Sequence, residues 1–558
     1  MDLIKKVVPF IIIFVISLLA VLPIWRNGFF PMHDDTQPTR IFEMHEALKD
    51  GQFPVRWVED LGYGYGYPIF NFYGPLPYYL GAGFMFLGFD ALVATKLVMT
   101  LGMILAGLAF YLVAFQKWGK LAALTGSIFY ILAPYHAVQL YVRGALGEFM
   151  AFAFLPLAFG LFFGPPTKWR LLFGIFGMAA VVISHTIAGF MLFWFIALYF
   201  LVKLAWDLLQ KKNIDGLTKL QFGCVLLALS LSAFFWLPAL TEAHLTRVNM
   251  LSQGSNNFHN HFVYPDQLWD SAWGFAGSAP GKLDGMSFKI GKLHVIGVLI
   301  TLVLLIWKRK QRLKIDTAQI TVLFGGLILA TFMMLEISRW LWELMPGFEF
   351  IQYPWRFLMF VVFFGSWLIV ILWVQMQPFI RHNMIRYLLG CALISAAIIW
   401  YGKYFEPQYT NAKTAADYTD TSKMKWELSR ISDEYLPLDF PIPSSQDGIA
   451  SRSFRESSAI IVKTEDIRSH RLHLSFSAKQ AAEIFFSRAN FPEWLVVLDG
   501  TKIKPEIKNG KIQVGVSGGE HNLTMYLADT PVRLLGNYLS LLSGLVLLGF
   551  VIKTQQSR

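Results

Sequence analysis

The sequence predicts an all-α polytopic membrane bundle of about 12 transmembrane helices, followed by a C-terminal external β-sandwich domain. Of the 558 residues, 55% are hydrophobic and only 15% are charged, and the mean hydropathy is +0.48, which excludes a water-soluble globular protein. Apolar runs long enough to cross a bilayer recur along most of the chain. Residues 402–532 instead alternate between apolar and polar side chains, as half-exposed β-strands do.

The apolar runs define the predicted transmembrane helices. A helix needs about 20 apolar residues to cross the hydrocarbon core, and slightly shorter runs suffice where the bilayer adapts. The first run follows Lys5 and Lys6 without a small-residue cleavage site, so we interpret it as an uncleaved signal-anchor. The runs lie near residues 7–25, 92–115, 121–135, 146–163, 171–186, 187–206, 219–238, 294–307, 318–337, 354–375, 386–401 and 533–553.

An additional apolar piece at residues 75–89 is ambiguous, because counting it as a span would move every later loop across the membrane. Basic residues decide the question, since they favour the cytoplasmic side. With this piece excluded, both termini and all the basic loops are cytoplasmic; these loops hold Lys117 and Lys120, Lys168 and Arg170, Lys211 and Lys212, residues 308–314, and Arg381 and Arg386. We therefore predict that 75–89 dips into the outer leaflet or packs on the bundle. The same clusters account for the net charge of +11 without a nucleic-acid partner.

This topology divides the chain into three predicted domains. Residues 1–401 form the transmembrane domain, with a first external loop at 26–91. Residues 402–532 form the extracytoplasmic β-sandwich, and 533–558 form a last transmembrane helix and a cytoplasmic tail. Alternating strands are expected at 459–462, 471–476 and 511–516, and the turn signals are Asp499-Gly500, Asn509-Gly510 and Gly518-Gly519.

An acidic pair, Asp34-Asp35, begins the first external loop directly after Pro31-Met32-His33. One carboxylate can act as general base on an acceptor hydroxyl while its neighbour orients that hydroxyl, and we predict this pair to be catalytic. The pair can also ligate a divalent cation, Mg²⁺ or Mn²⁺, because hard cations prefer oxygen ligands. The structural alternative is a solvated loop in which Asp35 or Thr36 caps the helix that follows.

The second external loop contains Arg143, and Glu148 begins the membrane helix after it. An arginine can clamp phosphate oxygens, and an ionisable group in a membrane helix needs a purpose or a partner. Two interpretations remain open: both residues contact substrate, or they form a structural ion pair. Either interpretation places them beside the site.

Other candidate substrate contacts lie at the same predicted face. His185 interrupts two spans, and it is either a hydrogen-bonded residue of the helix break or a substrate contact. Arg356 opens another span, where it meets a lipid phosphate or snorkels to headgroups. Tyr73 belongs to the aromatic, glycine-rich run 62–79, which packs on the outer leaflet or stacks on a sugar. We include His33, beside the acidic pair, among the predicted substrate contacts.

These motifs resemble those of GT-C type membrane glycosyltransferases, and most closely the bacterial integral membrane proteins named 6-pyruvoyl-tetrahydropterin synthase-related. The resemblance covers roughly residues 1–400, and residues 491–500 resemble the distal β-domain of lipoteichoic-acid-modifying membrane proteins. No soluble pterin-enzyme motif accompanies the name. The motifs that carry the resemblance are His33-Asp34-Asp35, residues 67–76, residues 141–148, Ser184-His185-Thr186 and residues 353–357.

The resemblance implies an inverting sugar transfer from a polyprenyl-phosphate donor to an extracytoplasmic glycan, lipid or protein. It assigns the base or metal-ligand role to Asp34 or Asp35, and the lipid-phosphate site to Arg143 and Arg356. It places the protein in the bacterial cytoplasmic membrane, with its active face extracytoplasmic and membrane lipids around it. The alternatives are a transporter or flippase of a lipid-linked saccharide and a non-catalytic, glycan-binding membrane scaffold.

Overall fold

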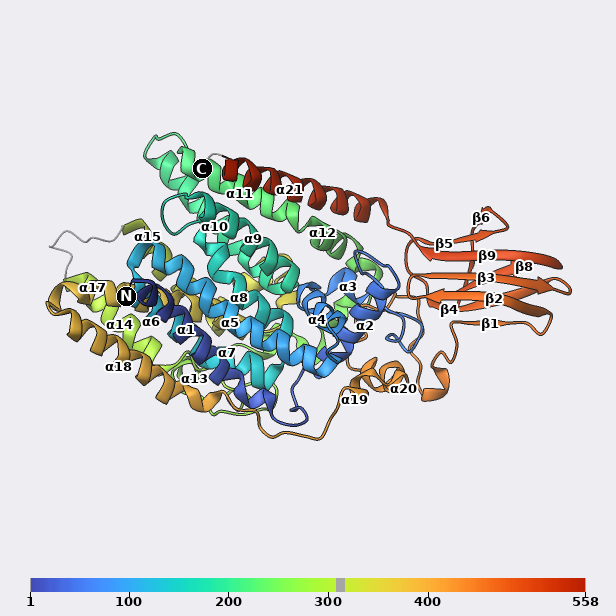
Figure 1. Ribbon diagram of the computed structural model, residues 1–558, viewed down its shortest axis with the longest axis horizontal. Coiled ribbons are helices and arrows are strands. Elements are labelled where there is room, and N and C mark those ends of the chain that lie inside the picture. Colours follow the sequence, from blue (N-terminus) through green and yellow to red (C-terminus); the bar gives the residue numbers. More distant parts are fainter. Residues whose placement is uncertain (1, 308–316, 557–558) are drawn as a thin grey trace. The chain divides into compact units, whose positions relative to one another are not determined.

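The computed structural model describes residues 2–307 and 317–556. The chain folds as two compact units, each assembled from separate stretches of sequence (Figure 1). The first unit contains residues 1–35, 96–229 and 251–412, and the second contains 36–95, 230–250 and 413–558. The acidic pair therefore belongs to the first unit and Tyr73 to the second.

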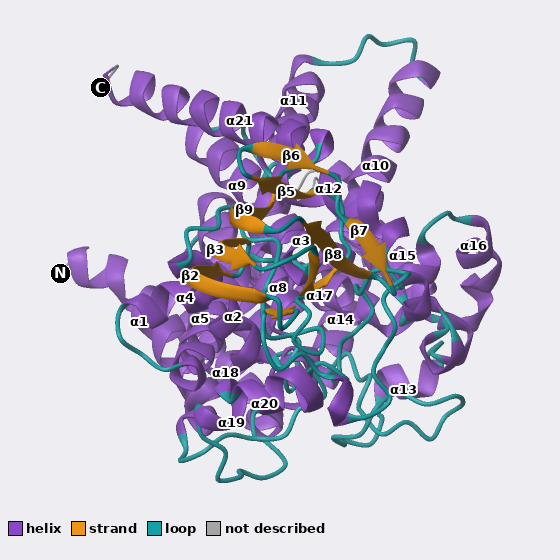
Figure 2. Ribbon diagram, turned by 90° about the vertical axis from the view of Figure 1, so that its right-hand side faces the viewer, coloured by secondary structure: helices purple, strands orange, loops and turns teal. Residues whose placement is uncertain are grey.

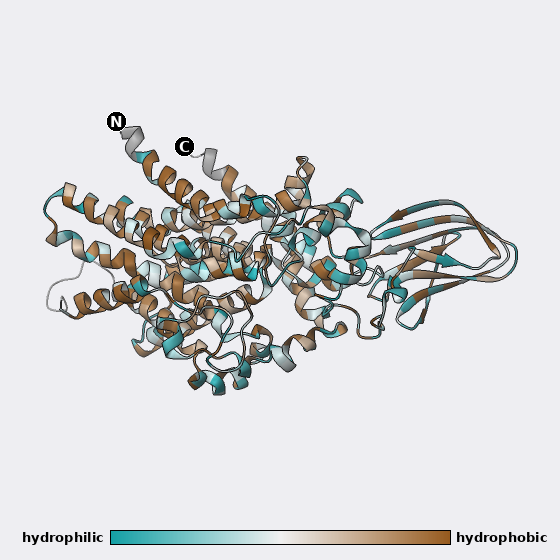
Figure 3. Cartoon of the chain, turned by 90° about the horizontal axis from the view of Figure 1, so that it is seen from below, coloured by the Kyte–Doolittle hydropathy of each residue, from teal (hydrophilic) through white to brown (hydrophobic). Residues whose placement is uncertain are grey.

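The first unit is built of helices whose residues are mostly hydrophobic, as the brown ribbons of Figure 3 show. The helices that lie wholly or largely in it are α1 (Asp2–Val21), α5 (Ala91–Trp118), α6 (Lys120–Leu132), α7 (Pro134–Ala137), α8 (Leu146–Gly160), α9 (Lys168–Ser184), α10 (Thr186–Leu209), α11 (Gly216–Leu231), α13 (Pro265–Trp269), α14 (Lys292–Trp307), α15 (Thr317–Met334), α16 (Arg339–Leu344), α17 (Leu358–Met376) and α18 (Asn383–Tyr401).

A helix lies on every predicted span, and the mostly helical membrane architecture is confirmed. The predicted number of about 12 spans is not confirmed. Among the described residues, six helices are long and apolar enough to cross a membrane, or eight if two bent helix pairs each count as one span. Three further apolar helices, including α8 and α14, have fewer than 18 residues. The basic loop 308–314 lies outside the described residues.

Helix α17 forms the centre of the first unit. It is apolar on all sides and almost completely buried, which a helix of this composition requires. Helices α6, α14 and α15 pack against it, and its Trp367 ring lies 4.7 Å from the ring of Phe110. A 3₁₀ turn, Pro354–Phe357, leads directly into α17. Packing around this helix therefore fixes the position of Arg356.

The second unit contains the helices α2 (Gln37–Lys49), α3 (Ile69–Phe72), α4 (Leu76–Phe86), α12 (Ala233–Glu242), α19 (Ala416–Thr419), α20 (Thr421–Lys423) and α21 (Pro531–Gln556). Helix α4 corresponds to the ambiguous piece 75–89. Its 11 residues span about 16 Å, roughly half the hydrocarbon thickness, so it is too short to cross a bilayer. It packs against α2 within this unit.

A buried ion pair joins α12 to α21. Glu242 Oε2 accepts hydrogen bonds from Arg533 Nε at 3.0 Å and from Arg533 Nη2 at 2.9 Å. Asn71 Nδ2 donates to the same oxygen at 2.8 Å, and Thr530 donates to Oε1 at 2.7 Å. The Arg533 side chain is 0% exposed. The carboxylate is fully satisfied, so this network fixes how the two helices pack.

The C-terminal β-sheets of the prediction are present in the second unit. One antiparallel sheet has the order β1-β4-β8-β7 and the other β2-β3-β9-β5-β6, and Figures 1 and 2 show the two sheets side by side as layers. The strands are β1 (Phe454–Glu456), β2 (Ile460–Arg468), β3 (Arg471–Ala478), β4 (Ala482–Ala489), β5 (Trp494–Leu498), β6 (Thr501–Ile503), β7 (Glu506–Lys508), β8 (Lys511–Val516) and β9 (Gly519–Leu527).

Two sequence features explain these strands: the alternation of buried and exposed residues along a strand, and turn residues that tolerate positive φ between strands. Every second residue of β3 is buried, so one face of the strand contributes to the core. Asp499-Gly500 joins β5 to β6, and Asn509-Gly510 joins β7 to β8; all four residues have positive φ. Two-residue hairpins need this left-handed backbone, which Asn, Asp and Gly tolerate best. Both turns were predicted from the sequence.

Candidate active site

Arg143 lies at the end of a π-helix, Val138–Arg143, which continues α7. Such π-helical turns are rare in proteins overall, but those that occur are frequently found at functional sites. The π-helix ends at Gly144, where φ is +59° and where a Cβ would lie 1.9 Å from Met32 Sδ. Only glycine therefore lets the first external loop lie against this turn.

Backbone hydrogen bonds attach the acidic loop to the same turn. His33 N donates to Val142 O at 3.1 Å, and Asp34 N donates to Arg143 O at 2.9 Å. The Asp34 carboxylate, which is partly exposed, interacts electrostatically with the Arg143 guanidinium. Asp35 follows in the same turn and is also partly exposed. The structure thus brings a predicted base and a predicted phosphate ligand together.

Glu148 is the centre of a buried polar cluster at the start of α8. Its Oε2 accepts a hydrogen bond from Arg143 Nη1 at 2.7 Å, and Arg356 Nε lies 3.8 Å from the same oxygen. Its Oε1 accepts hydrogen bonds from Tyr135 Oη at 2.6 Å and from Gln139 Nε2 at 3.1 Å. The ion pair expected as the structural alternative is therefore formed, with Arg356 beside it.

The cluster contains more positive than negative charge. Two guanidinium groups flank the one carboxylate, and both arginines are at least nine-tenths buried. Arg356 donates one hydrogen bond, to Ile351 O at 3.2 Å, but its Nε has no hydrogen-bond acceptor among the described residues. Arg143 also lies 4.6 Å from the centre of the Trp355 ring. A buried guanidinium with an unused donor is costly unless an anion completes its hydrogen bonding.

His185 caps helix α10, because its Nδ1 accepts a hydrogen bond from Ala188 N at 3.1 Å. The structural interpretation of this residue is thus realised. A neutral imidazole that accepts at Nδ1 carries its proton on Nε2. A Cβ at Gly147 would lie 2.8 Å from Ser184 O and 3.3 Å from His185 Cδ2. Glycine before Glu148 therefore allows α8 and the helix break to approach closely.

Two further predicted substrate contacts are His33 and Tyr73. His33 is exposed, and its Nε2 is 3.1 Å from Phe275 O. In the second unit, the guanidinium of Arg40 lies 4.4 Å from the centre of the Tyr73 ring. That ring therefore already has a cation–π partner. The substrate contacts of both residues stay predictions.

Sequence reasoning missed Tyr135 and Gln139 as partners of Glu148. One signal could have found them: Tyr135, Gln139 and Arg143 recur at intervals of four, which places polar side chains on one face of a helix.

The metal hypothesis concerned Asp34 and Asp35. Among residues 2–307 and 317–556, no group of three or more His, Cys, Asp or Glu side chains is arranged to hold a metal ion. The pair supplies two carboxylates without a third ligand, so we derive no step through a metal.

Residues 70–402 match the family of membrane proteins described as 6-pyruvoyl-tetrahydropterin synthase related domain. The match covers more than half of the chain. The chain belongs to this family. The family prediction is thereby confirmed, and the matched region includes Arg143, Glu148, His185 and Arg356, whereas Asp34 and Asp35 precede it.

The chain is also similar to an uncharacterized protein of Lactococcus lactis subsp. cremoris (strain MG1363), with 27% identity over 272 residues. This similarity covers 47% of the chain and 44% of that protein. The chain therefore matches less than half the length of this relative.

Three solved structures of glycosyltransferases are similar to the chain. The mycobacterial arabinofuranosyltransferase AftD has 12% identity and a TM-score of 0.47, covering 74% of this chain and 28% of AftD. ArnT of Cupriavidus metallidurans, bound to undecaprenyl phosphate, has 12% identity and a TM-score of 0.31, with coverages of 72% and 90%. The Archaeoglobus fulgidus oligosaccharyltransferase has 15% identity and a TM-score of 0.36, with coverages of 80% and 59%.

Proposed function

We propose that this protein is an inverting membrane glycosyltransferase. It transfers a sugar from a polyprenyl-phosphate donor to a hydroxyl of an extracytoplasmic glycan, lipid or protein, at the outer face of the bacterial cytoplasmic membrane. The observation that carries this proposal is the attachment of Asp34 to Arg143, next to a buried cluster with one cation in excess.

In this reaction the acceptor oxygen attacks the anomeric carbon while the bond from that carbon to the phosphate oxygen breaks. The acceptor proton passes to a carboxylate, and the polyprenyl phosphate leaves with its bonding electrons. Asp34 is the first candidate for the base, because its charge interacts with Arg143 and its backbone is held in place. Asp35 is the second candidate. Inversion follows from a single displacement.

Arg143 and Arg356 are the residues that we assign to bind the leaving phosphate. Negative charge grows on its oxygens as the bond to the sugar breaks, and buried guanidinium groups stabilise such charge strongly. Arg356 Nε offers a donor that is not used by the described residues. Glu148 holds Arg143 in one orientation through the 2.7 Å hydrogen bond. It acts as a positioning residue.

A transfer assay with the purified full chain tests this proposal. Several polyprenyl-phosphate sugars are supplied with a mixture of envelope glycans and lipids, and the products are identified by mass spectrometry and their anomeric configuration by NMR. We expect a sugar with an inverted anomeric centre in the product. Movement of a lipid-linked saccharide between vesicle leaflets without any transfer would overturn the proposal in favour of a flippase.

A further inference from the structure

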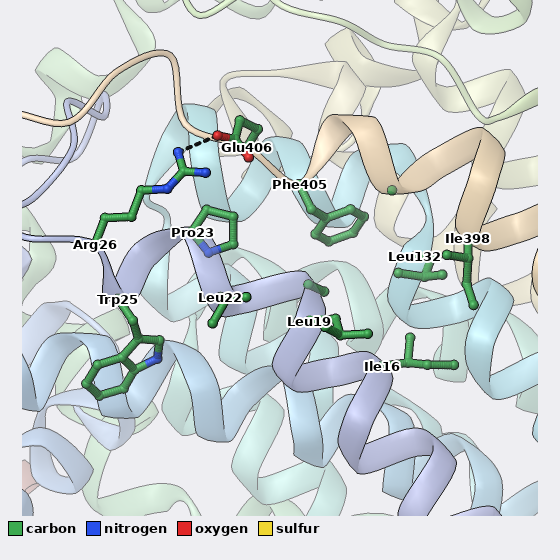
Figure 4. A pocket seen from close by; sticks show the side chains of 12 residues that line it. Ile16, Leu19, Leu22, Pro23, Trp25, Arg26, Leu132, Ile398, Phe405 and Glu406 are labelled. Atoms are coloured by element: carbon green, nitrogen blue, oxygen red, sulfur yellow. Dashed lines mark hydrogen bonds and ion pairs between the residues drawn. The ribbon is translucent and has the colours of Figure 1, made fainter.

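An apolar groove of about 530 Å³ lies between α1 and α18 in the first unit. Figure 4 shows its walls, which are formed by Ile16, Leu19 and Leu22 on one side and by Ile398 on the other. Both wall helices belong to candidate membrane spans, Lys6–Trp25 and Asn383–Tyr404. Leu19 is 58% exposed, so the groove opens sideways at a depth where the surroundings are lipid chains.

The mouth of the groove is charged. Arg26 and Glu406 form an ion pair across it, drawn as a dashed line in Figure 4, and their side chains are 51% and 50% exposed. The mouth therefore presents one guanidinium group, and the carboxylate paired with it is itself half exposed. An exposed ion pair contributes little stability and exchanges partners readily. The Arg26 guanidinium matches an anionic headgroup, and the apolar walls match a hydrocarbon tail.

Tyr141 links the groove to the candidate active site through direct contacts. Tyr141 Oη donates a hydrogen bond to Ala20 O at 2.6 Å, and Ala20 lines the groove. The ring of Tyr141 also lies 6.3 Å from that of Phe405, another lining residue. Tyr141 belongs to the π-helix that ends at Arg143. One short helix therefore supports both the groove and the arginine of the active site.

We infer that this groove is the membrane-side docking site of the lipid carrier. Its apolar walls hold the isoprenoid chain next to the headgroup, and Arg26 pairs with the carrier phosphate in place of Glu406. The identity of the carrier rests on the proposed function. Glu406 thus competes with the phosphate for one guanidinium, which keeps docking reversible before the carrier reaches Arg143.

Gly402 offers a direct test, because it lines the groove with ordinary helical dihedral angles and a Cβ there meets no atom within 4 Å. Gly402→Phe should fold and fill the groove. Gly325→Phe, at an equally open position of α15, is the matched control. The measurement is binding of polyprenyl monophosphate to the full chain in detergent, by native mass spectrometry. Losing about two methylene contacts should lower the affinity about tenfold in the groove variant alone.

Two charge variants provide a second test, because they are expected to change the affinity for the carrier in opposite directions. Arg26→Gln should weaken binding of polyprenyl monophosphate about three- to tenfold, because it removes the phosphate partner. Glu406→Gln should strengthen binding, because it removes the competitor. If the ion pair were only structural, neither change would alter the affinity for the carrier.

Three results would overturn the inference: unchanged affinity in Gly402→Phe, the same sign of effect for both charge variants, or equal occupancy by phosphatidylglycerol, which would mark an ordinary bilayer-lipid groove. The probe carries no sugar, so these results do not depend on transfer. Normal carrier binding with no transfer under any condition would instead contradict the proposed function.

Discussion

The backbone amide of Asp34 donates the hydrogen bond that attaches this residue to the π-helix, and the side chain takes no part in that bond. Replacing its carboxylate by a carboxamide of almost the same volume therefore removes the base without removing that attachment. We expect Asp34→Asn, and Asp35→Asn if the second residue acts as base, to lower the transfer rate about 10²- to 10⁴-fold. The measurement is the initial rate of sugar transfer for each purified variant.

Gel filtration in detergent controls for folding of these two variants. If both transfer sugar at the normal rate, the pair has no part in the mechanism, and Glu148 becomes the carboxylate to examine.

Arg143 and Arg356 are the residues for which a conservative change is informative. A lysine keeps the charge beside Glu148 but loses the planar, multiply donating guanidinium. We expect Arg143→Lys and Arg356→Lys to weaken binding of the carrier about 10- to 100-fold, the value of one or two charge-assisted hydrogen bonds. Binding is measured by titration with polyprenyl monophosphate.

Arg170→Lys is the matched control for these variants, since Arg170 is also buried in the first unit but donates to Gln116 and Phe163 O. Normal carrier binding by either site variant would show that the arginine concerned serves packing alone.

At the scale of single elements, helix α2 contains a carboxyl group whose folded environment opposes ionisation. Glu43 is buried, and burial, together with repulsion from the Asp60 carboxylate, raises its pKa well above the usual value. The protonated Glu43 carboxyl contributes its full stabilisation of the folded protein at pH values below its unfolded-state pKa. This stabilisation is lost as the pH rises through the higher, folded-state pKa. Glu43→Gln should therefore raise the melting temperature at pH 8 and leave it almost unchanged near pH 4.

Glu46→Gln, on the exposed side of the same helix, controls for the effect of an amide in this region. A melting temperature of Glu43→Gln that falls in parallel with the wild type from pH 5 to pH 8 would contradict the assignment.

Helices α12 and α21 depend on the buried pair Glu242–Arg533. Removing one partner leaves the other charge buried and unpaired, which typically costs about 3–5 kcal/mol. Arg533→Ala should therefore lower the thermal stability strongly, whereas Arg468→Ala should change it little because the Arg468–Asp466 pair is exposed. Thermal unfolding in detergent compares the two. Equal shifts would show that the buried network is not a stability determinant.

At the scale of the whole molecule, the topology predicts that residues 402–532 face away from the cytoplasm. Protease added to spheroplasts should then cut this segment and the external loops, and spare the cytoplasmic loops. Cleavage only after the membrane is opened would contradict both the sidedness and the exclusion of residues 75–89 as a span. Helix α4, with its 11 residues, supports that exclusion.

Much of the architecture is encoded locally and was accessible from the sequence. An apolar run identifies a membrane helix wherever it packs, because the bilayer forces the backbone to satisfy its own hydrogen bonds. Asn509-Gly510 and Asp499-Gly500 identify hairpins for an equally local reason, their tolerance of positive φ. The predicted number of spans is not confirmed, because hydropathy does not reveal where a short helix such as α8 ends or where a pair of helices bends.

The sequence by itself determined the class of the protein, its helices and strands, and the residue types of the candidate site, since these follow from composition and periodicity. Only the tertiary structure decided which of those residues meet. Glu148 lies beside Arg356, which comes from the turn before α17, and Asp34 is hydrogen-bonded to Arg143 through the backbone. Glu242 pairs with Arg533, which is 291 residues away in the sequence. Such contacts depend on how distant helices pack around buried charge, and no local pattern in the chain encodes that packing.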